Sequence, residues 1–193
     1  MLRIIAGSAR NRRIEASEGK NTRPTLDRVR ENLFNILQTR IRDSVVLDLF
    51  AGSGALSFEA ISRGAARAVL CDIDRNANRI EKQNAQTLGF SEQTEIFCCD
   101  WRTAVRMLQD RGEHFDLVFL DPPYRMTDLS EISGKLLPLI SADSLVIAEH
   151  EAKQSPEIGE GFEKTDERKW GFCGISFYRK KEEAPEYAEE TNE

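Results

Sequence analysis

Between residues 45 and 149, short apolar runs alternate with stretches of helical periodicity, and this alternation restricts the chain to few folds. The apolar runs predict strands over 45–49, 68–72, 94–99, 115–120 and 145–149. The stretches between them predict helices over 55–63, 76–88, 101–110 and 129–140, the last interrupted near Pro138. Strands that alternate with helices form right-handed β-α-β units around a mostly parallel sheet. The sequence therefore predicts an α/β protein.

The sequence on either side of this alternating region predicts additional elements. Runs over 2–6 and 12–15 predict a β-hairpin with a basic turn. Thr25 is expected to cap a helix whose apolar residues recur at helical spacing as far as Ile41. Two final runs predict an antiparallel pair of strands over 162–169 and 171–179.

These patterns divide the chain into three parts. We expect residues 1–24 to form a basic β-hairpin extension with a loop, and residues 25–180 to form the α/β domain. That domain is expected to contain a mostly parallel seven-stranded sheet that ends in an antiparallel C-terminal hairpin. Residues 181–193 are acidic and lack apolar periodicity, so we expect a disordered tail.

Four successive strands are expected to end in aspartate. The acids are Asp48, Asp72, Asp100 and Asp121. The carboxyl ends of parallel strands meet at one edge of the sheet, and open α/β sheets bind ligands at this edge. Each acid alone is unremarkable after a strand, but four in succession predict a binding site.

The loop after the first core strand favours a particular ligand. Gly52 and Gly54 allow a ligand to approach the backbone before a helix N-terminus. Ser57 replaces the third glycine of the dinucleotide pattern, and Asp48 would oppose a pyrophosphate but suits an ammonium group. Phe50 is counted with the cofactor-binding residues of this loop, and its main expected role is to pack in the core.

The next two strand ends complete the predicted ligand. Asp72 can accept both hydroxyls of a ribose, with Asp74 as the competing choice. Asp100 can accept from the exocyclic amine of adenine, and Trp101 is a possible adenine contact. An amino-acid end, a ribose and an adenine together describe S-adenosylmethionine.

The charge is distributed unevenly along the chain. Residues 1–42 hold ten Lys/Arg and four acids, whereas the whole chain has a net charge of −6. A basic segment on an acidic protein indicates a polyanion-binding face, although a solvated surface explains the charge equally well. The candidate RNA-binding residues are Arg10, Arg12, Arg13, Arg23 and Arg28. Arg23 and Thr25 could instead fold over the cofactor.

Several classes of protein are disfavoured. The four cysteines form no C-x-x-C pair and the chain has only two histidines, so we expect no metal site. Cys71 and Cys98 fall in expected strands and are interpreted as buried, reduced thiols. No apolar run approaches the length of about 20 residues that crosses a bilayer. We expect a cytoplasmic protein that is a monomer and binds no membrane.

Two motifs carry a resemblance to a known family. Asp48-x-Phe50-x-Gly52-x-Gly54 together with Asp121-Pro122-Pro123-Tyr124 resembles the Rossmann-like class I methyltransferases that modify exocyclic amines. The more specific motif is Arg23-Pro24-Thr25-x-x-Arg28-Val29-Arg30-Glu31-x-Leu33-Phe34-Asn35. It is similar to that of the bacterial 16S rRNA guanine(966)-N2 methyltransferase D family. The resemblance covers about residues 1–180, and the acidic tail departs from it.

This resemblance implies an activity and a catalytic site. The expected reaction is methylation by S-adenosylmethionine of a guanine N2 amine in 16S rRNA, either free or within a small-subunit assembly intermediate. Asp121 and the Pro122 carbonyl would accept from the amine, and Tyr124 would stack on a splayed-out base. A DNA adenine-N6 or cytosine-N4 methyltransferase, a protein glutamine methyltransferase and a non-catalytic RNA-binding protein are the alternatives.

Overall fold

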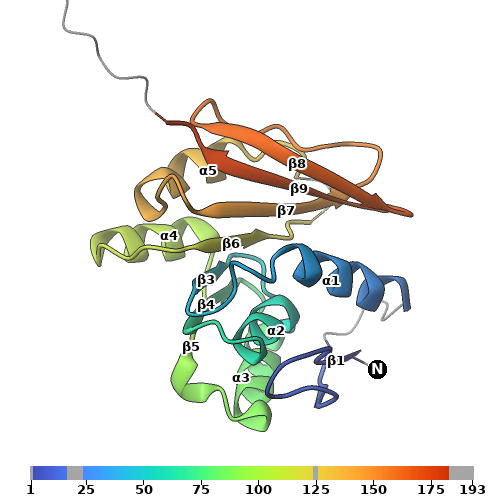
Figure 1. Ribbon diagram of the computed structural model, residues 1–193. Coiled ribbons are helices and arrows are strands. Elements are labelled where there is room, and N and C mark those ends of the chain that lie inside the picture. Colours follow the sequence, from blue (N-terminus) through green and yellow to red (C-terminus); the bar gives the residue numbers. More distant parts are fainter. Residues whose placement is uncertain (1, 17–23, 124–125, 183–193) are drawn as a thin grey trace, which may run out of the picture.

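The computed structural model describes residues 2–16, 24–123 and 126–182. Its strands are β1 Leu2–Arg3, β2 Arg13–Ile14, β3 Val45–Asp48, β4 Arg67–Asp72, β5 Thr94–Cys98, β6 Leu117–Leu120, β7 Leu145–Glu151, β8 Phe162–Trp170 and β9 Cys173–Lys180. Within these residues, the main sheet has seven strands in the order β5-β4-β3-β6-β7-β9-β8, and β1 pairs only with β2 (Figure 1). Strands β3 to β7 are parallel to one another, while β9 is antiparallel to both β7 and β8. The predicted fold class is confirmed.

Helices cover both faces of the sheet. They are α1 Pro24–Ile36, α2 Ala55–Ser62, α3 Arg75–Leu88, α4 Trp101–Asp110 and α5 Ser130–Leu136, with 3-10 turns at Ser91–Gln93 and Leu137–Leu139. Phe34, Phe58 and Leu88 place α1, α2 and α3 in one buried cluster. Leu108 and Ile132 place α4 and α5 in a second cluster. The two clusters lie on opposite faces because residues alternate between them along each strand.

The chain connections reverse between β3 and β6, which are neighbours in the middle of the sheet. From β3 the chain passes through α2 to β4 and then through α3 to β5 on one face. It returns through α4 to β6 and continues through α5 to β7 on the other face. Open α/β sheets bind ligands outside the carboxyl ends of the strands at such a reversal. The topology therefore puts the candidate site at the ends of β3 and β6.

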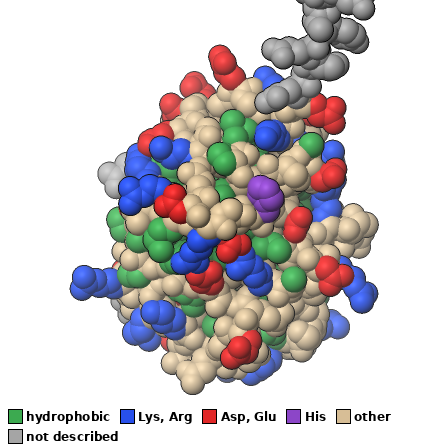
Figure 2. Space-filling view, turned by 90° about the vertical axis from the view of Figure 1, so that its left-hand side faces the viewer, with side chains coloured by type: hydrophobic (Ala, Val, Ile, Leu, Met, Phe, Trp, Pro, Cys, Tyr) green, Lys and Arg blue, Asp and Glu red, His purple; other side chains and the backbone are tan. Residues whose placement is uncertain are grey.

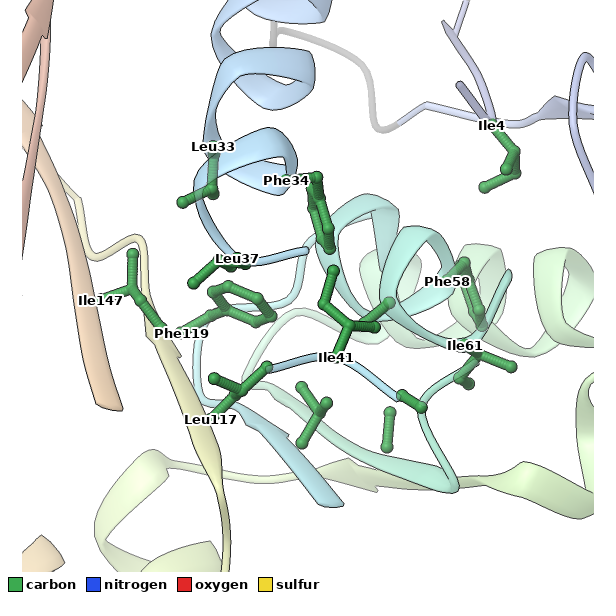
Figure 3. Close-up of a cluster of buried hydrophobic side chains, with 14 of the residues drawn as sticks. Ile4, Leu33, Phe34, Leu37, Ile41, Phe58, Ile61, Leu117, Phe119 and Ile147 are labelled. Carbon is green, nitrogen blue, oxygen red and sulfur yellow. The ribbon is translucent and has the colours of Figure 1, made fainter. Parts of the chain in front are cut away.

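The first core cluster fixes α1 against the sheet. Figure 3 shows Leu33, Phe34 and Leu37 facing Phe119 and Ile147 across the interior. The rings of Phe34 and Phe119 lie 6.0 Å apart between centroids at an interplanar angle of 48°. Tilted aromatic pairs at this distance add to the stabilisation from apolar burial. The helix that carries the Arg-Pro-Thr motif is thereby held over β6 and β7.

A buried glutamate attaches the N-terminal segment to α2. Glu59 is fully buried, and its carboxylate accepts from the amides of Ile5 (2.7 Å) and Ala6 (3.0 Å). Arg63 pairs with the same carboxylate at 2.7 Å. The segment also approaches α2 so closely at Gly7 that a Cβ there would lie 1.7 Å from the carbonyl oxygen of Ser62. Figure 1 shows this segment beside α2 and α3.

Three local predictions are wrong. Helix α1 begins at Pro24, so Thr25 lies inside the helix instead of capping it; the φ of proline suits the first helical position. The same helix ends at Ile36, not at Ile41, because hydrogen-bonded turns over 37–44 lead the chain into β3. Cys98 is exposed because it lies at the end of β5, the edge strand of the sheet, whereas Cys71 is buried as predicted.

Candidate active site

All four predicted aspartates lie at the carboxyl ends of parallel strands. Asp48 and Asp72 are the last residues of β3 and β4, and Asp121 directly follows β6. Asp100 follows the end of β5 by two residues and is the N-cap of α4. Their common edge is therefore the one that the sequence predicts, and it includes the reversal between β3 and β6.

Asp48 is held in place by a residue that the sequence motif does not emphasise. Its side chain is 1% exposed and accepts from the hydroxyl of Ser57 at 3.0 Å. Ser57 occupies the position of the third glycine in the dinucleotide pattern. Ser57, which argues against a dinucleotide, thus has a structural role of its own, because its hydroxyl orients the buried carboxylate of Asp48.

Asp72 organises the glycine-rich loop. Its two carboxylate oxygens accept from the amides of Gly52 and Asp74, each at 2.9 Å. Asp74 in turn caps α3 by accepting from the amide of Asn76 at 2.9 Å. Gly54 has a φ of 75°, and a Cβ there would lie 2.3 Å from the ring of Phe58. Gly54 therefore lies in close contact with α2, and Gly52 connects the loop to Asp72; the contacts of both glycines with the cofactor stay predictions.

A third acid of this region, Glu81 of α3, was missed by the sequence reasoning. It is fully buried, and its Oε1 atom has no hydrogen-bond partner among the described residues. Burial, followed by the charges of Asp72 and Asp48, raises the pKa of Glu81 to about 8. Three carboxyl groups on these elements form a set of acceptors that fits a cationic ligand such as a sulfonium with an amino-acid group.

The raised pKa of Glu81 makes stability depend on pH. Between the ordinary pKa of 4.5 and the folded value of about 8, only the folded state keeps this proton. The free energy of unfolding should therefore fall as pH rises through this window, by at most about 1.4 kcal/mol per pH unit. Glu81→Gln should lack this fall when wild type and variant are compared by urea denaturation across the window. The exposed Glu92→Gln variant is the control, and a wild-type slope in Glu81→Gln would contradict the assignment.

Asp100 and Trp101 begin α4. Asp100 accepts from the amide of Arg102 at 2.9 Å as the helix N-cap. Trp101 is 5% exposed in the second core cluster, with Arg102 4.5 Å above its ring, and its Nε1 atom has no partner among the described residues. Phe50 is half-buried against the same cluster. The contacts of Asp100 and Trp101 with adenine, and of Phe50 with the cofactor, stay predictions.

The Asp-Pro-Pro-Tyr motif begins where β6 ends. All four residues of β6 are buried, as the apolar run predicts, and Asp121 is half-buried. Pro122 is buried and lines a cavity of about 120 Å³ that also contacts Glu149 of β7. Tyr124 lies outside the described residues, so its stacking role stays a prediction.

The basic residues are separated by the fold. Arg10, Arg12, Arg13 and Arg28 are all exposed, but Arg12 also donates to the carbonyls of Thr87 and Leu88 at the end of α3. Arg23 and the tail 183–193 lie outside the described residues. Figure 2 shows the face at the left of Figure 1, where basic and acidic side chains are intermixed. A polyanion-binding surface is therefore to be sought elsewhere on the molecule.

Two further observations concern metal ions and membranes. Among the residues that the structure describes, no group of three His, Cys, Asp or Glu side chains is placed to hold a metal ion. In the same part of the chain, no helix combines the length and the apolarity needed to span a bilayer.

The fold and the acids at its reversal point define the class of protein as a class I methyltransferase fold. The structure of "Putative methyltransferase yhhF from Escherichia coli" superposes with a TM-score of 0.79 at 34% identity, covering 93% of this chain and 97% of that one. The chain belongs to the family described as Conserved hypothetical protein 95, whose model matches residues 2–179, and it is similar to proteins named ribosomal RNA small subunit methyltransferase D.

Two relatives illustrate this membership. "Putative rRNA methyltransferase YlbH" of Bacillus subtilis is 32% identical over 183 residues, which cover 93% of this chain and 100% of the relative. "Ribosomal RNA small subunit methyltransferase D" of Haemophilus influenzae is 42% identical over 137 residues, which cover 70% of each chain. The resemblance suggested by the Arg-Pro-Thr and Asp-Pro-Pro-Tyr motifs is confirmed at the level of the family.

Proposed function

We propose that this protein transfers a methyl group from S-adenosylmethionine to the exocyclic N2 amine of a guanine in 16S rRNA, guanine 966 by family resemblance. The observation that carries the proposal is the position of Asp121-Pro122. These residues directly follow β6 at the topological reversal, and β6 is the neighbour of β3, which ends at Asp48. The names of the relatives support small-subunit rRNA as the substrate. We propose a cytoplasmic monomer.

The residues of the reversal point suit the cofactor. Asp48 and Glu81 would accept from the cationic amino-acid end, and Asp72 from the ribose hydroxyls. Gly52 lets the ligand approach the loop that Asp72 holds. Asp100 and Trp101 would lie at the adenine. S-adenosylmethionine supplies, when bound, a methyl group activated by the sulfonium.

The protein's contribution to the reaction is mainly alignment. The N2 lone pair of guanine is delocalised into the ring, so the amine is a poor nucleophile. Asp121 and the Pro122 carbonyl would accept the two N–H bonds, which directs the remaining lone pair and stabilises positive charge developing on nitrogen. The fixed φ of Pro122 and Pro123 restricts the direction of that carbonyl. Tyr124 would stack on the splayed-out base.

The proposal is tested by methyl transfer in vitro. Purified protein and labelled S-adenosylmethionine are incubated with 16S rRNA and with small subunits from a strain that lacks the gene. Nuclease digestion and mass spectrometry of the product should show N2-methylguanosine at one position. Label on adenine or cytosine, or on DNA, would favour the alternative methyltransferases. Cofactor binding without transfer to any nucleic acid would contradict the proposed activity.

The exposed arginines of the N-terminal segment are expected to contact RNA phosphates. The double variant Arg10→Ala/Arg13→Ala should bind rRNA more weakly and reduce the slope of log affinity against log salt by about 2. The measurement is filter binding at several salt concentrations. Arg111→Ala is the control, because Arg111 is paired with Glu95 at 2.7 Å at the far end of α4. An unchanged slope in the double variant would exclude these two contacts.

A further inference from the structure

The target base must bind beside Asp121 and Pro122 if the proposed function is correct. Both residues directly follow β6, and β7 is the neighbouring strand on the side away from β3. The side chains of β7 that lie level with Asp121 on the same face of the sheet should therefore help to decide which base is accepted.

Glu149 occupies the position next to Asp121 on the neighbouring strand. Phe119 of β6 pairs with Ile147 of β7, and Leu120 pairs with Ala148. One step further, beyond the last ladder pair, the corresponding residues are Asp121 and Glu149. Phe119 and Ile147 both belong to the cluster under α1, so alternation along the strands assigns Asp121 and Glu149 to this same face. Neighbouring strands are about 4.8 Å apart, which brings the two carboxylates to adjacent positions.

The electrostatics of a third strand, β9, agree with this placement of the two acids. Cys173, the first residue of β9, pairs with Glu151 of β7. Burial raises the pKa of the Cys173 thiol, and Glu149, through its charge and a hydrogen bond, and the charge of Asp121 raise this pKa further. Both carboxylates therefore lie close to the same thiol, although they belong to different strands. The site consequently presents two anionic acceptors side by side.

Guanine is the base whose edge matches two adjacent acceptors. Its reactive N2 amine is next to N1–H, so two neighbouring positions donate hydrogen bonds. In adenine and cytosine the ring nitrogen beside the exocyclic amine is an acceptor, which a carboxylate repels. An enzyme that reads a splayed-out base through its Watson–Crick edge can use this difference. Asp121 alone cannot, because it accepts from any exocyclic amine.

We propose that Glu149 selects guanine by accepting a hydrogen bond from N1–H while Asp121 and the Pro122 carbonyl hold the N2 amine. This assignment rests on the proposed function. It makes Glu149 a specificity-determining residue that contacts the substrate. At the ring position beside the amine, guanine carries a hydrogen-bond donor, whereas adenine and cytosine carry an acceptor. The Glu149 carboxylate supplies a charge-assisted acceptor at this position.

The test compares guanine with 2-aminopurine, which keeps the 2-amino group but carries an acceptor at N1. Small-subunit rRNAs with either base at the mapped position compete for the enzyme, so the ratio of kcat/KM values does not depend on the folded fraction of a variant. The wild-type protein should prefer guanine by roughly 100-fold or more, because 2-aminopurine leaves the carboxylate unpaired. Glu149→Gln should bring the ratio within about tenfold, since an amide can donate to N1 of 2-aminopurine.

Two further variants make the result decisive. Glu149→Ala should lower the preference for guanine while S-adenosylmethionine affinity, measured by calorimetry, stays within about twofold of wild type. The exposed Glu163→Gln on β8 should keep the wild-type ratio. A wild-type ratio in both Glu149 variants would overturn the role of Glu149 and leave guanine methylation standing. Failure of the wild-type protein to methylate guanine N2 would overturn both proposals.

Discussion

Asp121→Ala is expected to abolish methyl transfer to rRNA and to leave the affinity for S-adenosylmethionine nearly unchanged. Asp121 begins the loop after β6 at the reversal point, whereas the glycine-rich loop is held by Asp72. Loss of one preorganised acceptor for the reacting amine should lower kcat by roughly 10²- to 10³-fold or more. Single-turnover kinetics on rRNA measure the loss, and equilibrium binding measures the cofactor affinity.

Two controls define what this result would mean. Asp110→Ala removes an exposed aspartate at the end of α4 and should keep full activity. Asp121→Asn keeps an oxygen acceptor without the charge and should retain more activity than Asp121→Ala. Near-normal turnover in Asp121→Ala would show that another group aligns the amine. A parallel loss of cofactor affinity would instead assign Asp121 to cofactor binding.

Glu59→Ala is expected to destabilise the protein by about 3 kcal/mol or more. The substitution leaves the amides of Ile5 and Ala6 without their acceptor and Arg63, which is 14% exposed, without its ion pair. A partner removed from a buried pair costs more than the pair contributes, because the remaining charge and donors stay desolvated. Urea denaturation with linear extrapolation measures the change in the free energy of unfolding.

The matched variant for this prediction is Glu59→Gln, whose amide keeps one acceptor oxygen and loses the charge. Its free energy of unfolding should lie between the values for wild type and for Glu59→Ala. Glu92→Ala, on the exposed 3-10 turn before β5, should change stability by less than about 0.5 kcal/mol. A loss below about 1 kcal/mol in Glu59→Ala would show that the N-terminal segment is held by other contacts, such as the close approach at Gly7.

The acids of the site differ in how far the sequence could predict them. Asp48, Asp72, Asp100 and Asp121 each follow an apolar run, so the strand pattern alone brings them to one edge. Glu81 lies within the helix α3 and Glu149 within the strand β7, and neither position carries a motif. Their relevance comes from neighbours that are distant along the chain, namely Asp48 and Asp72 for Glu81 and Cys173 for Glu149.

The basic segment, residues 1–42, shows the same limit of prediction from sequence. Its composition predicts a polyanion-binding face, but composition does not distinguish an arginine in solvent from one that holds the fold. Arg12 donates to the end of α3, and Arg30 is buried and donates to the carbonyl of Arg3 at 2.5 Å. Arg10, Arg13 and Arg28 remain on the surface. Only long-range contacts separate these two groups.

The sequence by itself determined the fold class, the family and the edge of the sheet that carries the site. Strand and helix periods, and the residues at strand ends, are local properties, and parallel strands convert them into a shared edge. The tertiary structure alone decided which side chains come together at that edge: Ser57 donates to Asp48, the charges of Asp72 and Asp48 act on Glu81, and the strand register puts Glu149 next to Asp121. Strand order and register bring these side chains together, and both follow from packing between residues that are far apart in the chain.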